Sequence, residues 1–94
     1  MRITWDENKN RSNKQKHKVS LEVASLVFTD PFHLSIMERI ENGEERWQTI
    51  GMVGNVVVLL VAHTAAEQEG EEVVRIISAR KVTRKERQMY EEGR

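Results

Sequence analysis

Hydrophobic residues recur at helical spacing in the first third of the chain. Asp6 can cap a helix that runs from Glu7 to about Lys16, and this helix is so polar that it should lie on the surface with little core contact. Ser20 can cap a second helix, which should end at Asp30 because the residue before a proline disfavours the helical conformation. The apolar residues of this second helix share one face, which we expect to be buried: Leu21, Ala24, Val27 and Phe28.

The hydrophobic period changes to two from Leu34 onward, as is typical of β-strands. Asn42-Gly43 predicts a two-residue hairpin turn, and Gly51 with Gly54-Asn55 predicts the next turn. The acidic residues 67–72 should form a loop. Four strands are predicted, the third almost continuously apolar as in a strand covered on both faces: residues 34–40, 45–50, 56–62 and 73–81.

Two further elements complete the predicted fold. Arg2-Ile3-Thr4-Trp5 alternates like a short strand. Thr83 and Glu86 form a capping box, which predicts a final helix to about Glu92. The sequence therefore predicts a single α+β domain over residues 1–94, with N-terminal helices, an antiparallel four-stranded β-meander, an extra short N-terminal strand and a C-terminal helix.

The composition excludes several classes of protein. No apolar run approaches the roughly 20 residues of a membrane helix, and the N-terminus lacks the apolar stretch of a signal peptide, so we expect a cytoplasmic protein. The absence of cysteine excludes disulfides, thiolate zinc sites and cysteine nucleophiles. No two of the three histidines have the spacing of metal ligands, and the sequence predicts neither a metal nor a cofactor.

The net charge of zero hides an uneven distribution. Residues 1–20 carry six basic and two acidic side chains, and residues 75–87 carry six basic side chains against Glu86. Residues 21–74 hold ten acids and only Arg39 and Arg46. If the fold brings the two basic ends together, they would form a positive patch suited to phosphate. Two separate solvated helix faces fit the same pattern.

Several basic residues are candidates for chemistry. His17 ends the polar first helix, where an imidazole could act as a base, although a plain exposed histidine is the simpler interpretation. Arg46 stands in the acidic middle, where Glu44 or Glu45 could simply pair with it. His63 closes the buried strand, and we interpret it as structural.

The last predicted strand is the most informative basic segment. Strict alternation places Arg75 and Lys81 on one face and Arg80 on the other. One site could then use Arg75 and Lys81, or Arg80, but not all three unless a bulge or the strand end redirects one of them. RNA cleavage without a metal needs little more than such groups, because the 2′-hydroxyl is the nucleophile. The protein need only supply a base, an acid and cations for the crowded phosphate.

Several short segments, spread over nearly the whole chain, have a distinctive order and spacing: Trp5-Asp6-Glu7-Asn8-Lys9, Asn13-Lys14-Gln15-Lys16-His17, Phe28-Thr29-Asp30-Pro31, Gly43-Glu44-Glu45-Arg46, Ile50-Gly51, Arg75-Ile76-Ile77-Ser78-Ala79-Arg80-Lys81, Glu86-Arg87 and Tyr90. Together they resemble the BrnT family of type II toxin–antitoxin toxins. The resemblance implies a RelE-like fold and a metal-independent endoribonuclease that halts translation.

The resemblance also implies partners. They are an RNA substrate and a BrnA-type antitoxin whose ribbon-helix-helix end binds operator DNA. Two toxins and two antitoxins would assemble, and the complex would repress its own promoter, so this chain would reach DNA only through the antitoxin. Direct DNA binding by the chain is disfavoured, because no helix-turn-helix pattern is present.

Residue roles follow from the resemblance by position. It implies that His17, Arg46 and Arg80 lie near the chemistry. It implies that three further residues steer RNA: Lys16, Arg75 and Lys81.

The chain departs from the family pattern at two positions. Lys18 stands where the family usually has glycine, which should alter the turn before the second helix. Ala66 stands where the family usually has arginine, so a cation facing the substrate is missing. Either this member is naturally weak, or the change was introduced so that the toxin could be produced without killing its host. The main alternative function is a non-catalytic module that binds the antitoxin or nucleic acid.

Overall fold

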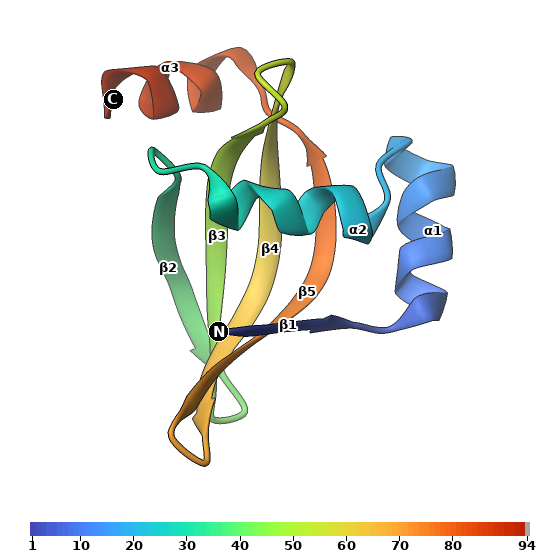
Figure 1. Ribbon diagram of the computed structural model, residues 1–94, viewed down its shortest axis with the longest axis vertical. Helices are drawn as coiled ribbons and strands as arrows, with labels where there is room; N and C mark the ends of the chain where they lie inside the picture. Colours follow the sequence, from blue (N-terminus) through green and yellow to red (C-terminus); the bar gives the residue numbers. More distant parts are fainter. Residues whose placement is uncertain (94) are drawn as a thin grey trace.

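A five-stranded sheet in the order β1-β5-β4-β3-β2 forms the centre of the molecule (Figure 1). The computed structural model describes residues 1–93. The strands are β1 (Arg2–Trp5), β2 (Leu34–Glu41), β3 (Glu44–Val53), β4 (Val57–Gln68) and β5 (Glu71–Lys81). The helices are α1 (Glu7–His17), α2 (Leu21–Ala24), the 3-10 helix η1 (Ser25–Thr29) and α3 (Arg84–Glu92).

The sheet contains one parallel pair of strands in addition to the predicted antiparallel pairs. The α+β class is confirmed, and β2 to β5 pair antiparallel in chain order. The predicted four strands are only part of the sheet, because β1 pairs in parallel with β5. Parallel strands need a long crossover connection, and the whole chain between residues 6 and 70 supplies it.

Two predicted loops are strand instead. Residues 67–72 were expected to form a loop, but β4 and β5 continue through them to a tight turn at Glu69-Gly70, where both residues have positive φ. Gly51 lies inside β3 rather than in a turn. A Cβ atom at Gly51 would lie 2.8 Å from the Cβ atom of Val27 and 2.9 Å from its carbonyl oxygen. Close approach of η1 to the sheet therefore requires this glycine.

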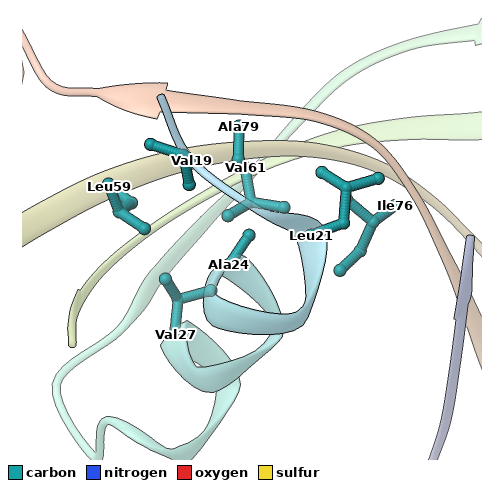
Figure 2. Packing of buried hydrophobic residues seen from close by; sticks show 8 residues of the cluster. All are labelled: Val19, Leu21, Ala24, Val27, Leu59, Val61, Ile76 and Ala79. Carbon is teal, nitrogen blue, oxygen red and sulfur yellow. The ribbon is translucent and has the colours of Figure 1, made fainter. Parts of the chain in front are cut away.

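The main core lies between the sheet and the segment formed by α2 and η1. Ser20 caps α2 as predicted, accepting a hydrogen bond from the backbone of Val23 at 3.1 Å. Figure 2 shows the predicted buried face of this segment against side chains of β4 and β5. The labelled residues are Val19, Leu21, Ala24, Val27, Leu59, Val61, Ile76 and Ala79. A second cluster on the opposite face holds Tyr90 of α3 against Ile50, Val58 and Leu60.

The polar helix α1 is attached to the fold by buried amides, which the sequence did not reveal. Asn13 donates to the carbonyl oxygens of Val19 and Ala79, both at 2.8 Å, and accepts from the Ala79 backbone N–H at 3.0 Å. Asn10 accepts from the backbone of Leu21 at 2.8 Å. The pairing of β1 with β5 ends at Ile76, so Asn13 satisfies edge groups of β5 that a longer β1 would have paired.

The substitution at Lys18 falls on the residue that ends α1. Lys18 adopts the left-handed conformation with φ 61° and ψ 27°, and its backbone N–H donates to the Lys14 carbonyl at 3.0 Å. Glycine adopts this conformation without a Cβ clash, which is the backbone reason for the glycine that the resemblance implies here. Lysine adopts it here at a cost of about 1 kcal/mol.

Candidate functional site

Arginine side chains on neighbouring strands form a row on one face of the sheet. Arg46 on β3 lies opposite Thr64 on β4, and Thr64 lies opposite Arg75 on β5. Arg39 on β2 continues the row opposite Arg46. Residues directly opposite one another share a face, and neighbours along a strand alternate. Because Ile76 is buried in the core under α2, Arg75 and the rest of this arginine row (Arg39, Arg46 and Arg75) lie on the other face.

A β-bulge brings Arg80 to the same face as Arg75. The register of β4 and β5 shifts at Ile77, which has no partner on β4. The extra residue reverses the alternation beyond it. The prediction that Arg75 shares a face with Lys81, and that Arg80 points the other way, is therefore wrong. The alternative in which a bulge redirects one residue describes the strand correctly.

Burial agrees with this assignment of faces. Arg80 lies opposite Leu60, whose side chain packs with Tyr90 beneath α3. Lys81 lies opposite Leu59, which belongs to the core beneath α2. Lys81 is exposed at the end of β5, on the face away from the arginine row.

Carboxylates accompany the arginine row. Arg75 Nη2 donates to both carboxylate oxygens of Glu44 at 3.1 Å. Arg46 Nη2 lies 3.6 Å from Glu44 and 3.9 Å from Glu41, which confirms that Glu44 pairs with Arg46. Glu45 instead accepts a hydrogen bond from Trp47 on the other face. Glu44 thus lies between the two arginines and partly neutralises both.

Arg46 is the more enclosed of these two arginines. Its side chain is 24 % exposed, against 44 % for Arg75. The Nε atom of Arg46 is buried without a hydrogen-bond partner. A buried donor left unpaired carries a desolvation cost, so a partially desolvated cation is held in the middle of the sheet face.

Arg80 is fixed by the first turn of α3. Its Nη1 and Nη2 atoms donate to the two oxygens of Glu86 at 2.8 and 2.9 Å. These bonds are the main cause that lowers the pKa of Glu86 from 4.5 to about 2, and they raise the pKa of Arg80. Glu86 also accepts from the backbone N–H of Thr83 at 2.9 Å, completing the predicted capping box. One carboxylate therefore caps the helix and orients the arginine.

His17 lies beside the bulge, at the C-terminal end of α1. It is half-buried, and Lys16 next to it is exposed. Both line a shallow hollow of about 230 Å³ together with Ile77 and Ser78 of β5. Ser78 shares the face of Arg80, so the hollow borders that face. Within residues 1–93, no hydrogen bond or ion pair joins His17 to the arginines.

Ala66 lies on the same face as the arginine row. It is exposed on β4, two residues beyond Thr64 and opposite Val73. It lines a shallow hollow of about 430 Å³ with Glu44 and Glu67. An arginine at this position would project beside Glu44 and extend the row toward the hairpin end of the sheet.

The other two histidines belong to the opposite side of the molecule. His63 is 4 % exposed, bonds to the Thr49 hydroxyl at 2.7 Å and to the Thr64 carbonyl at 3.1 Å, and burial lowers its pKa. His33 bonds to the carbonyl oxygen of Asp30 at 2.8 Å. These contacts agree with a structural interpretation of His63.

Residues 1–93 contain neither a candidate metal site nor a membrane-spanning helix. No group of three or more histidine, aspartate and glutamate side chains there could hold a metal ion. No helix in that range has both the length and the apolar character needed to cross a membrane.

Comparison with known proteins decides the family. A family model described as "Ribonuclease toxin, BrnT, of type II toxin-antitoxin system" matches residues 5–86. The chain belongs to the BrnT family. A crystal structure at 1.1 Å resolution of the ribonuclease toxin BrnT from Brucella abortus has a similar fold, with a TM-score of 0.63. That likeness covers 89 % of this chain and 99 % of the Brucella chain at 20 % sequence identity. A search of curated protein sequences gives no match.

BrnT membership agrees with the sequence resemblance, while the structure adds residues that the sequence did not single out. Arg39 extends the arginine row, and Glu44 bridges two of its members. Glu86 was recognised only as a capping residue. The hairpin turn at Asn42-Gly43 could have fixed the register of Arg39 and Arg46, but the pairing of Glu44 with Arg75 spans 31 residues and has no local signal.

The pairing of Arg80 with Glu86 should make stability depend on acid pH. The pKa of Glu86 is lower in the folded chain than in the unfolded one, so its contribution is complete above pH 4.5 and disappears as the pH falls toward 2. Because the Arg80 side chain is 38 % exposed, solvent screens the pair, and we expect a contribution of about 1 kcal/mol. The Glu86→Gln variant should unfold more easily in urea at pH 7 and should lose less stability than the parent between pH 5 and pH 2.5.

Glu92→Gln is the matched control, since Glu92 lies at the far end of the same helix. Equal urea midpoints for Glu86→Gln and the control at pH 7 would show that the ion pair does not stabilise the fold.

Proposed function

We propose that the chain is an endoribonuclease toxin that cleaves RNA on the arginine-bearing face of the sheet, without a metal ion, and thereby stops translation. Membership of a ribonuclease toxin family supports the activity. The observation that carries the location is the shared face of Arg46, Arg75 and Arg80, which Arg80 joins because of the bulge at Ile77. Cations held on one open face are what a phosphodiester and its transition state require.

Roles can be proposed for individual residues. Arg46 and Arg80 would stabilise the charge that develops on the phosphate, because both are partially enclosed and oriented by carboxylates. His17 would transfer a proton from the edge of this face, next to the bulge. Arg75 and Lys16 would hold the RNA backbone on either side. Lys81 is left out, because it lies on the other face of β5.

RNA binding requires the arginines to exchange partners. Glu44 occupies the space between Arg46 and Arg75, and Glu41 lies close to Arg46. A phosphate would have to displace Glu44 and would repel it. The site is therefore partly neutralised by its own carboxylate, and Ala66 supplies no additional cation beside it. Both features predict weak activity for this member of the family.

We also propose the partners that the family implies. A type II toxin requires an antitoxin, and we propose a BrnA-type ribbon-helix-helix protein that assembles as two toxins with two antitoxins in the cytoplasm. The complex would repress its own operon. Operator DNA would be contacted by the antitoxin, since the cations of this chain on the sheet face suit an RNA phosphate and not a groove-reading helix.

RNA affinity should change in opposite directions at two residues of the site. Arg75→Gln removes a phosphate contact and should weaken binding about fivefold, whereas Glu44→Gln removes the competing carboxylate and should strengthen it by a similar factor. The measurement is fluorescence anisotropy of a labelled single-stranded RNA at low and high salt.

Glu92→Gln again serves as the charge-matched control for Glu44→Gln. The two substitutions change net charge equally. Equal effects on RNA affinity would therefore show that only the net charge matters and would contradict a local binding site at Glu44.

The experiment that tests the function itself is RNA cleavage by the purified chain in the presence of EDTA. His17→Ala, Arg46→Ala and Arg80→Ala should each lower the cleavage rate about 100-fold, as is typical when one proton-transfer or electrostatic group is lost. Lys85→Ala, an exposed lysine on α3 outside the site, is the control. Cleavage by all three variants at the rate of the parent chain would refute the catalytic assignment.

Restoring the usual arginine at position 66 should increase toxicity. Ala66→Arg places a guanidinium on the face of the arginine row, beside Glu44, where it would both bind phosphate and draw the carboxylate away. Growth after induced expression, with and without the antitoxin, measures the effect. Val56→Arg, at an exposed position in the β3–β4 turn, controls for added charge. Unchanged growth inhibition at verified expression would show that position 66 has no role in function.

The second candidate function is a non-catalytic binding module. The pairing of each arginine of the row with a carboxylate favours it, because such a face is stable without RNA. Binding and turnover separate the two functions. RNA that is bound and remains intact with the parent chain and with Ala66→Arg would support the binding module.

A further inference from the structure

The face of the sheet opposite the arginine row carries an apolar groove near the hairpin ends. In Figure 1, α2 and η1 cross the strands, and the hairpin ends of the sheet extend beyond them. The groove has a volume of about 370 Å³. Phe28 of η1, Trp47 of β3, Val74 of β5 and Met1 line it, together with Glu45 and Glu72. A single large side chain fits in such a volume with room to spare.

Exposed apolar side chains continue from the groove along β2. Met37 lies opposite Trp47, and Ile40 lies opposite Glu45, so both share the face of the groove. They are 47 % and 64 % exposed, and Met1 at the other side is 61 % exposed. A contiguous apolar surface next to polar residues is characteristic of a protein-binding site.

The charge around the groove selects the chemistry of its occupant. Glu67 on β4 lies directly opposite Glu72 on β5, an arrangement that destabilises a sheet. Within residues 1–93, neither carboxylate forms an ion pair with a lysine or arginine. Glu45 on the same face adds a third negative charge, with Trp47 as its hydrogen-bond donor. These carboxylates would repel an RNA phosphate and attract lysine or arginine.

We propose that this groove docks a basic segment of a partner protein, which inserts a large apolar side chain between Phe28 and Trp47 and places lysine or arginine against Glu67 and Glu72. The antitoxin that the family implies is the partner that fits. The proposal rests on that part of the proposed function and is independent of RNA cleavage, because the groove and the arginine row lie on opposite faces of the sheet.

The test uses the full chain and a fluorescent peptide in which one tryptophan and two leucines stand among lysines. Anisotropy should show saturable binding that weakens with salt. The double variant Glu67→Gln, Glu72→Gln should bind about tenfold more weakly, from two lost surface pairs. Ala65→Tyr, which fills the groove, should abolish binding. A control double variant, Glu69→Gln with Glu92→Gln, makes the same charge change outside the groove and should bind like the parent.

Several controls separate this proposal from its alternatives. A peptide with glutamate in place of lysine, a lysine peptide without the apolar residues, and a single-stranded RNA should all bind weakly. Equal binding of any of these, or an equal loss of affinity in the control double variant and in Glu67→Gln with Glu72→Gln, would overturn the proposal. A dimer in sedimentation that Ala65→Tyr dissociates would do so too, because a second copy of the chain would then occupy the groove.

The same variants distinguish this proposal from the ribonuclease function. RNA cleavage should be unchanged in Ala65→Tyr, because residue 65 faces the groove and not the arginine row. If the parent chain binds the peptide and leaves RNA intact, the ribonuclease proposal is refuted and the groove proposal is supported. If the parent chain cleaves RNA but does not bind the peptide, the groove proposal is refuted and the ribonuclease proposal is supported.

Discussion

The backbone of Ala79 imposes the constraint on which the rest of the structure depends. β1 is too short to pair with β5 beyond Ile76, so the edge groups of Ala79 need another partner. The side-chain amide of Asn13 is that partner: it donates to the Ala79 carbonyl and accepts from the Ala79 backbone N–H. A helix with almost no apolar residues is thereby fixed against the sheet, and His17 at its end lies beside the bulge at Ile77. The Asn13 amide pairs with the edge of β5 where β1 has ended, and this contact positions His17 near the arginine-bearing face.

The two faces of the sheet differ in what they can bind. One carries Arg46, Arg75 and Arg80 and is suited to phosphate, while the other carries an apolar groove among Glu45, Glu67 and Glu72. Alternation along β3, β4 and β5 keeps these charges apart, although they lie within a few residues of each other in the sequence. The arginine row and the groove are therefore separate surfaces with no side chain in common.

Local signals in the sequence predicted most of the elements. Caps at Asp6 and Ser20, the turn at Asn42-Gly43 and the capping box at Thr83 were all identified correctly, because each depends on residues within a few positions. The long hairpin through residues 67–72 was missed, because its acidic composition is typical of loops and only pairing with the neighbouring strand makes it β-structure.

Glu86 has two functions at one carboxylate, and this couples a helix to the site. Its oxygens cap the first turn of α3 and hold the guanidinium of Arg80. By thermodynamic linkage, a phosphate that draws Arg80 away weakens the start of α3, and a protein that pulls α3 from the sheet releases Arg80 with the same coupling free energy. The stability of the first turn of α3 and the position of the Arg80 guanidinium are therefore coupled through one side chain.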